Sequence, residues 1–158
     1  MSQHTANTMS FRPSGLASLR TWLNRHSIDI LRVALGGVFL GFGALKFFPG
    51  VSPAEGLAVE TVETLTLGVI SGQAALLVTA SLESVIGLTL VTGRFVRIGL
   101  GLLAVALLGI LSPVVLFFGQ LFPAGGPTLQ AQNVLKDVIL IGAGLVVAAS
   151  ALGSRLTD

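Results

Sequence analysis

Residues 28–48 read IDILRVALGGVFLGFGALKFF, an apolar run that contains only Asp29, Arg32 and Lys46 as charged residues. A helix needs about 20 mostly apolar residues to cross the roughly 30 Å hydrocarbon core of a bilayer. The run has that length, and it stops at Pro49-Gly50, where a helix is expected to end. We therefore interpret it as a membrane-spanning helix that is not removed as a signal peptide.

Three further runs of similar character follow, at about 73–91, 98–118 and 130–152. The chain of 158 residues is 53% hydrophobic and only 10% charged, and its mean hydropathy is +0.91. These values lie far from those of a soluble domain. The sequence therefore predicts an all-α membrane protein, a four-transmembrane-helix bundle over 28–152, with no room for a separate soluble domain.

Basic residues are sorted by the ends of the predicted spans. The two loops expected on one side contain no Lys or Arg, whereas the amino-terminal flank, the turn after the second span and the carboxyl tail contain Arg12, Arg20, Arg25, Arg94, Arg97 and Arg155. Cytoplasmic loops carry such an excess, so the sequence predicts an N-in/C-in topology with a cytoplasmic tail at 153–158. This sorting explains the basic pI without a nucleic-acid partner.

Two extra helices are expected outside the spans. In the polar, basic segment 1–27, Leu16, Leu19 and Trp22 recur at helical spacing, which fits either an interfacial amphipathic helix or a basic flank of the first span. After the first span, Ser52 followed by Pro53 and Glu55 predicts an N-cap, and the residues beyond it predict an amphipathic loop helix on the outer surface.

Charged residues inside the spans are the candidates for function. A charge near the bilayer centre costs about 2.5–3.5 kcal/mol, so such residues face the bundle interior and are paired. Counted from the cytoplasmic end of each span, Arg32 would lie roughly 6 Å deep in the first span and Glu83 roughly 12 Å deep in the second. Because a long Arg side chain bridges that difference, we predict an Arg32–Glu83 pair.

A second polar group is expected at the outer rim, where Lys46 closes the first span and the fourth begins. A polar pocket for an anionic or carbonyl-bearing ligand and a set of snorkelling anchors are both consistent with these residues. The candidate ligand-binding set is Arg32, Lys46, Glu83, Gln132, Lys136 and Asp137. In addition, Gly37 and Gly41 form a G-x-x-x-G on the first span, which favours close packing of another helix.

Several cofactors are excluded by composition. The chain has no cysteine, and its histidines and methionines, His4, His26, Met1 and Met9, all precede the first span. We therefore expect neither a haem nor a metal site between the spans. The remaining mixed-charge interior suits a quinone, a proton, a small anion or a partner helix, and it assigns no catalytic residue.

Four pieces of sequence in this order and spacing resemble the DoxX family of bacterial inner-membrane proteins. They are LRVALGGVF at 31–39 with GALKF at 43–47, Glu83 four residues before Gly87, Ser112-Pro113, and QNVLKD at 132–137. The resemblance covers about residues 28–150 and places Arg32, Lys46, Glu83, Gln132 and Lys136 in the family's polar pattern. Asp137 departs from the neutral Asn expected there, and the chain lacks the cysteines of thiol-linked relatives.

The resemblance implies a four-helix membrane bundle that, in some members, is linked to quinone-dependent sulfur oxidation or to membrane oxidoreductase complexes. Three functional hypotheses follow for this chain. The first is a quinone-associated or accessory subunit of a membrane redox or stress-response system. The second is a small proton-coupled transporter that uses Glu83, and the third is a non-catalytic assembly subunit. Lipid, other membrane or redox proteins and further copies of the chain are the expected partners.

Overall fold

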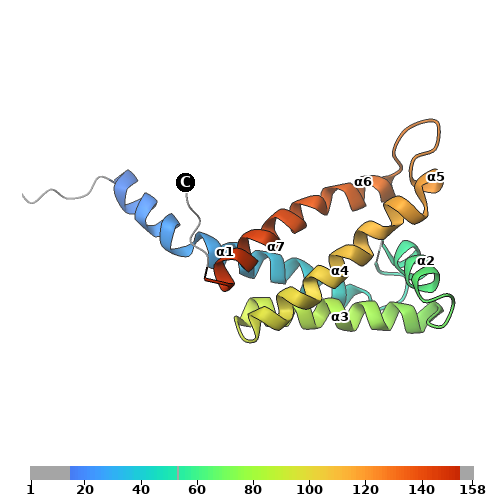
Figure 1. The fold of residues 1–158 in the computed structure, drawn as a ribbon, viewed down its shortest axis with the longest axis horizontal. Helices are drawn as coiled ribbons and strands as arrows, with labels where there is room; N and C mark the ends of the chain where they lie inside the picture. Colours follow the sequence, from blue (N-terminus) through green and yellow to red (C-terminus); the bar gives the residue numbers. More distant parts are fainter. Residues whose placement is uncertain (1–14, 53, 154–158) are drawn as a thin grey trace, which may run out of the picture.

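The computed structural model describes residues 15–52 and 54–153, and these form helices with no strand among them (Figure 1). The helices are α1 (Gly15–Leu45), α2 (Glu55–Leu65), α3 (Gly72–Thr92), α4 (Val96–Leu116), α5 (Phe118–Leu121), α6 (Leu129–Lys136) and α7 (Val138–Ala151). Four segments are long and apolar enough to cross a membrane: α1, α3, α4, and α6 with α7 over Leu129–Ala151. The predicted all-α protein with four candidate spans is therefore confirmed.

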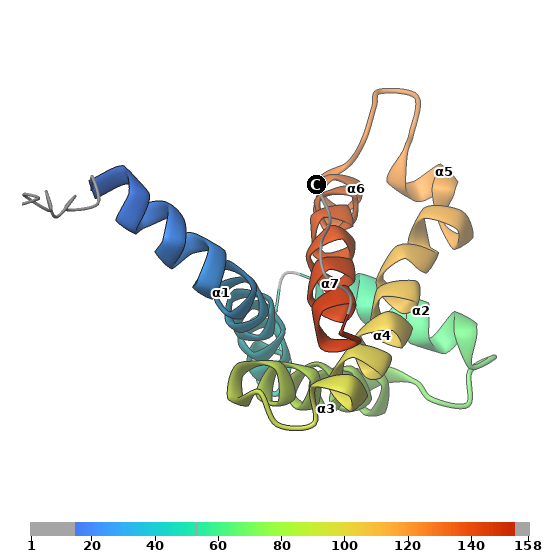
Figure 2. The ribbon, with the colours of Figure 1, turned by 60° about the vertical axis from the view of Figure 1, so that its left-hand side comes forward.

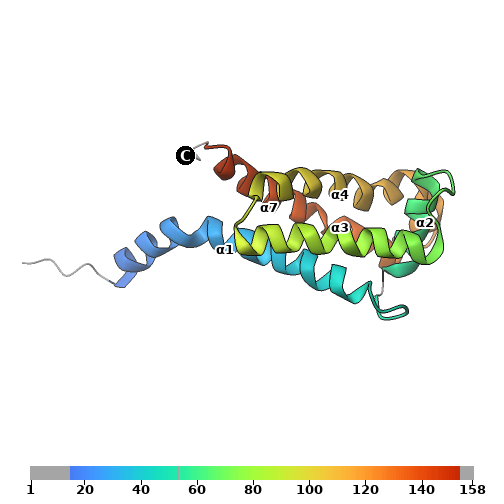
Figure 3. The same ribbon diagram turned by 90° about the horizontal axis from the view of Figure 1, so that it is seen from below.

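The four long segments form a bundle in which each contacts its neighbours in the cyclic order α1, α3, α4, α7 (Figures 2 and 3). Its core consists of Leu35 and Phe39 of α1, Ile86 and Leu90 of α3, and Leu103, Ala106 and Leu107 of α4. Large apolar side chains also point outward, such as Leu108, which is 72% exposed. In a bilayer these outward side chains face lipid tails, which are as apolar as the core.

α1 is one continuous helix of 31 residues, longer than the span predicted at 28–48. The interfacial helix that the sequence offered within 1–27 is therefore not a separate element among the described residues, because residues 15–27 continue directly into the span. This part projects beyond the other helices (Figure 3). At its other end α1 stops at Leu45, and the predicted last residues of the span form a turn in which the N–H of Lys46 donates to Gly43 O.

Glycines set the close approach of α1 and α3. A Cβ built on Gly87 would lie 2.5 Å from the backbone nitrogen of Leu40, and one on Gly36 would lie 2.8 Å from Leu90 Cβ. Further along, a Cβ on Gly43 would lie 2.9 Å from the backbone nitrogen of Ser84. No other residue fits at these positions without displacing the partner helix, so the glycines determine the antiparallel register of the two helices.

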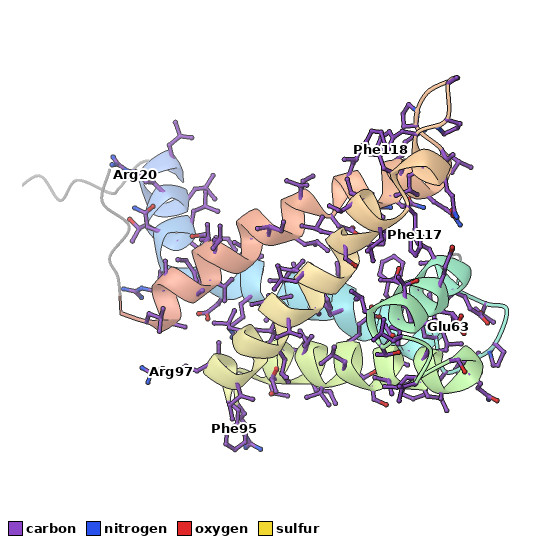
Figure 4. All side chains as sticks on the ribbon, turned by 45° about the vertical axis from the view of Figure 1, so that its right-hand side comes forward. Arg20, Glu63, Phe95, Arg97, Phe117 and Phe118 are labelled. Carbon is purple, nitrogen blue, oxygen red and sulfur yellow. The ribbon has the colours of Figure 1, made fainter. Side chains whose placement is uncertain are left out.

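One end of the bundle, which we call the acidic end, is covered by α2 (Figure 4). Glu63 Oε1 accepts a hydrogen bond of 2.7 Å from the N–H of Gly72 at the start of α3, and Glu55 Oε2 accepts one of 2.7 Å from the N–H of Gly50. Glu60 accepts a longer bond of 3.4 Å from Gln120. The carboxylates of α2 therefore connect it to the turn after α1, to the start of α3 and to α5. Glu63 is favourably placed at the positive end of the α3 dipole.

The predicted N-cap of this helix was wrong in detail. α2 begins at Glu55 with Ala54 as the residue before it, and no side chain caps it. The backbone oxygen of Ser52 accepts from the N–H of Glu55 at 3.2 Å, while its buried hydroxyl has no partner among the described residues. Glu55 cannot complete a capping box because its carboxylate binds Gly50 instead.

The last two candidate spans are interrupted near the acidic end. Pro113 has no N–H to donate to Gly109 O, and the Ser112 hydroxyl donates to that oxygen at 2.7 Å instead. α4 then ends at Leu116, so the span predicted at 98–118 is divided between α4 and α5. The span predicted at 130–152 is likewise divided, between α6 and α7, with Asp137 at the junction.

The opposite end of the bundle, the basic end, carries Arg20, Arg25, Arg94 and Arg97. Figure 4 shows Arg20 and Arg97 at this end and Glu63 at the other. The asymmetry is that of the positive-inside rule, and the orientation of the ends in a membrane stays a prediction. Arg12, Arg155 and most of the predicted tail lie outside the described residues.

Candidate functional site

The charged centre of the bundle is an ion pair between Lys46 and Glu83. Lys46 Nζ donates a hydrogen bond of 2.5 Å to Glu83 Oε2, and the two side chains are only 5% and 7% exposed. Within the described residues, no other ion pair has both partners buried. The predicted Arg32–Glu83 pair was therefore wrong, because Lys46 is the partner of Glu83.

The register of α1 and α3 brings these two residues together. Gly43 lies against Glu83 and Ser84, so Lys46, three residues later, lies about one helical turn nearer the acidic end. Its long side chain then reaches back to the carboxylate. Glu83 lies roughly 16 Å from the start of α3 and roughly 14 Å from its end, near the middle of the candidate span. A carboxylate at that depth is costly unless it is paired, and Lys46 supplies the partner.

Asp137 is a third charged group near this pair. It is half-buried and lies within electrostatic range of both Lys46 and Glu83. The chain is irregular there: the N–H of Asp137 donates to Val134 O at 3.1 Å, and its carbonyl accepts from the N–H of Leu140 at 2.9 Å. Both bonds span three residues instead of the four of an α-helix. Lys46 therefore pairs with one carboxylate, that of Glu83, and Asp137 adds a second negative charge in the neighbourhood.

The other members of the predicted outer pocket face away from this centre. Lys136 is exposed and donates to Asn133 Oδ1 at 2.8 Å, while Gln132 is exposed and donates to Pro127 O at 3.4 Å. Lys136 is exposed and Asp137 is half-buried because adjacent residues point about 100° apart around a helix. The structure thus pairs Lys46 with Glu83, places Asp137 in their neighbourhood, and leaves Lys136 and Gln132 exposed.

Arg32 has a different place, at the basic end. Its guanidinium donates to the backbone oxygen of Leu90, one of the last carbonyls of α3, and to Asp29 Oδ1 at 3.3 Å. It also packs over Gly93, whose positive φ of 71° ends α3. A cation at a helix C-terminus is favoured by the dipole, so Arg32 fastens α1 to the end of α3.

Gly37 and Gly41 lie outside the α1–α3 contact. Both are exposed, and a Cβ on either would meet no atom within 4 Å, unlike Gly36 and Gly43. They are therefore not used for packing within the described part of the chain. Packing of another molecule against this face stays a prediction.

Sequence reasoning missed the register of α1 against α3. The glycines of the two helices contain a signal that could have revealed it, and with it the Lys46–Glu83 pair. Depth counting assumed that the first two spans end at the same level, which placed Lys46 at the rim and Arg32 nearest to Glu83. The contacting glycines show otherwise, because Gly36, Gly43 and Gly87 allow the helices to meet in only one register. Aligning these small residues against one another would have placed Lys46 beside Glu83.

The fold and this site define a class: small polytopic membrane proteins with a four-helix bundle and a buried ion pair. The family model of DoxX matches residues 27–125, nearly two thirds of the chain. The chain therefore belongs to the DoxX family, as the resemblance indicated. The match includes Arg32, Lys46 and Glu83 but ends before Gln132, Lys136 and Asp137. No curated protein and no solved structure matches the chain.

Proposed function

We propose that this DoxX-family protein is a quinone-associated accessory subunit of a membrane redox or stress-response system in the bacterial inner membrane. The Lys46–Glu83 pair is the group that meets the quinone. The observation that supports this proposal is a hydrogen-bonded ammonium–carboxylate pair that is buried within a bundle with an apolar core. Such an intramembrane pair is retained for function more often than for stability, because buried ion pairs contribute little net stability.

The residues present fit a quinone in their chemistry. A quinone presents carbonyl oxygens that accept hydrogen bonds, and when bound it would supply electron transfer coupled to proton uptake. Lys46 has three N–H donors and uses one of them on Glu83, so the others are free to orient a carbonyl oxygen. A carboxyl group such as that of Glu83 can exchange a proton, and Lys46 lies within hydrogen-bond distance of it. The chain's own role is to position the quinone and to exchange a proton with it.

Titration of the full chain with a short-tailed quinone tests this proposal. The protein is purified in mild detergent, and binding is followed by calorimetry. We expect saturable binding that is weakened at least about tenfold in Lys46→Met and in Glu83→Gln, which corresponds to the loss of one charge-assisted hydrogen bond. Glu60→Gln is the matched carboxylate control and should bind as the wild type does. Absence of saturable binding to the wild type would overturn the proposal.

A proton-coupled transporter is the second candidate, and the interruption of the fourth span at Asp137 favours it. Transporters place substrate and ion sites where broken helices meet near the bilayer midplane. In this alternative Glu83 is alternately protonated and bound to Lys46. Proton flux into vesicles with a pH-sensitive dye inside discriminates it from the first proposal. The alternative requires flux that is lost in Glu83→Gln, and flux equal in both proteins removes it.

An assembly subunit without a ligand is the third candidate. The exposed Gly37 and Gly41 on the outward face of α1 favour it, since such residues let a second helix approach closely. It requires that a larger complex co-purifies with the wild type and dissociates in Gly37→Leu and Gly41→Leu. Gly142→Leu is the matched control, because Gly142 is also an exposed glycine with open space around it, on α7. Equal complex recovery from all variants removes this alternative.

A further inference from the structure

A cleft at the basic end lies apart from the Lys46–Glu83 site. It has a volume of about 310 Å³, and it is partly open to the outside between the middle of α1, the start of α4 and the end of α7. The lining residues are Ile28, Asp29, Arg32, Val96, Arg97, Val147, Ser150 and Ala151. The volume equals that of about ten water molecules, which is room for a small polar group and its hydration.

Two arginines, Arg32 and Arg97, give this cleft its positive charge and its hydrogen-bond donors. Arg32 is held in place by Leu90 O and Asp29, and its side chain is only 18% exposed. A guanidinium has five N–H donors, so donors remain on Arg32 after these contacts. Arg97 is exposed at the start of α4, and Figure 4 shows it extending past this end of the bundle. With Asp29 the three groups carry a net charge of about +1, and the Ser150 hydroxyl adds a neutral donor.

The rest of the lining is apolar. Ile28, Val96, Val147 and Ala151 come from three helices and lie beside the two arginines. A site for a free inorganic anion needs no apolar wall, whereas a phospholipid presents a phosphate next to its glycerol and acyl chains. Basic pockets between transmembrane helices bind anionic headgroups at the side of the membrane where Lys and Arg gather.

We propose that the cleft between α1, α4 and α7 binds a phosphate group, namely that of an anionic phospholipid headgroup. Arg97 and the free donors of Arg32 contact the phosphate oxygens, Ser150 donates to the headgroup, and the apolar residues contact the start of the acyl chains. Arg32 also fastens α1 to α3, so its substitution would affect both lipid binding and the fold. Arg97 is therefore the residue whose substitution tests binding. A lipid bound here joins three helices at the end that α2 does not cover.

Native mass spectrometry of the full chain in mild detergent tests this assignment. The protein is titrated with phosphatidylglycerol and, in parallel, with zwitterionic phosphatidylcholine. We expect one preferred phosphatidylglycerol adduct, weakened about tenfold in Arg97→Gln because a charge-assisted contact is lost. Arg94→Gln is the matched control, since Arg94 lies in the same basic turn, is exposed and does not line the cleft. Ser150→Ala should weaken the adduct less than Arg97→Gln does.

Three results would overturn the assignment. Equal binding of the two lipids would show that no headgroup is selected, and equal losses in Arg97→Gln and Arg94→Gln would show only a diffuse surface charge. The third result comes from adding inorganic phosphate. If millimolar phosphate displaces the lipid and itself binds in an Arg97-dependent manner, the cleft is a site for a free anion. Retention of the lipid in high phosphate supports the headgroup.

Discussion

Replacing Lys46 by Met should destabilise the protein strongly, and replacing Glu83 by Gln in the same chain should restore much of the loss. The 2.5 Å pair is almost fully buried, so each single change leaves one partner charged or forced to neutralise in an apolar surrounding. Removal of one partner of a buried pair costs about 3–5 kcal/mol. The double variant retains neither charge, so its loss should be well below the sum of about 6–10 kcal/mol.

The assay is thermal unfolding in mild detergent, followed by circular dichroism with the four proteins of the cycle in parallel. For a chain of this length about 1 kcal/mol corresponds to 2–4 °C, so each single variant should unfold about 6–20 °C below the wild type. Lys136→Met is a matched control, because Lys136 is exposed and changes at such sites stay within about 0.5 kcal/mol.

A second cycle, of Arg32→Gln with Glu83→Gln, separates the observed pair from the one that depth counting favoured. Arg32 contacts Leu90 O and Asp29 and not Glu83, so its loss and that of Glu83 should add within about 0.5 kcal/mol. Additive losses for Lys46 with Glu83, or a Lys46→Met variant as stable as Lys136→Met, would show that the two side chains do not form a stabilising pair.

Three further changes test the fold. Gly87→Leu should prevent folding, because its Cβ would lie 2.5 Å from the backbone nitrogen of Leu40, and this is measured as loss of monomeric protein in gel filtration. Gly37→Leu is the control and should leave the protein folded, because there is open space around Gly37. Glu63→Ala should lower the unfolding free energy by about 1 kcal/mol because the N–H of Gly72 loses its acceptor, and an unchanged midpoint would contradict that role. Thr128→Ala, which removes the side-chain cap of α6, should cost about 1 kcal/mol and speed amide exchange at the start of α6.

Composition alone predicted the four spans because the bilayer imposes one requirement on every residue of a span. An outward residue such as Leu108 and a core residue such as Leu103 are both apolar, so the sequence identifies the helix without telling its faces apart. Because both faces of a span are equally apolar, hydropathy also gives no information about the register of α1 against α3. Which glycine of α1 meets α3 depends on the shape of both surfaces, and Gly36 and Gly37 differ only in which side of the helix they occupy.

The sequence singled out the charged residues of the spans, but it did not show which of them are partners. Intramembrane charge singled out Lys46, Glu83 and Arg32 because each is costly in lipid. Their partners depend on the offset between helices, and an error of about two turns in that offset exchanged Lys46 for Arg32. The break at Asp137 was also not predicted, because neither a proline nor a glycine lies there to interrupt the helix.

The central claim, that Lys46 and Glu83 form the site of a quinone, is tested most directly by quantifying the quinone that co-purifies with the protein. The full chain is isolated in mild detergent, and quinone in the organic extract is measured per chain by mass spectrometry. We predict a stoichiometric quinone in the wild type, in Lys136→Met and in Glu60→Gln, and its loss in Lys46→Met and Glu83→Gln. A wild-type protein without quinone, or a folded Lys46→Met variant that retains it fully, would contradict the account.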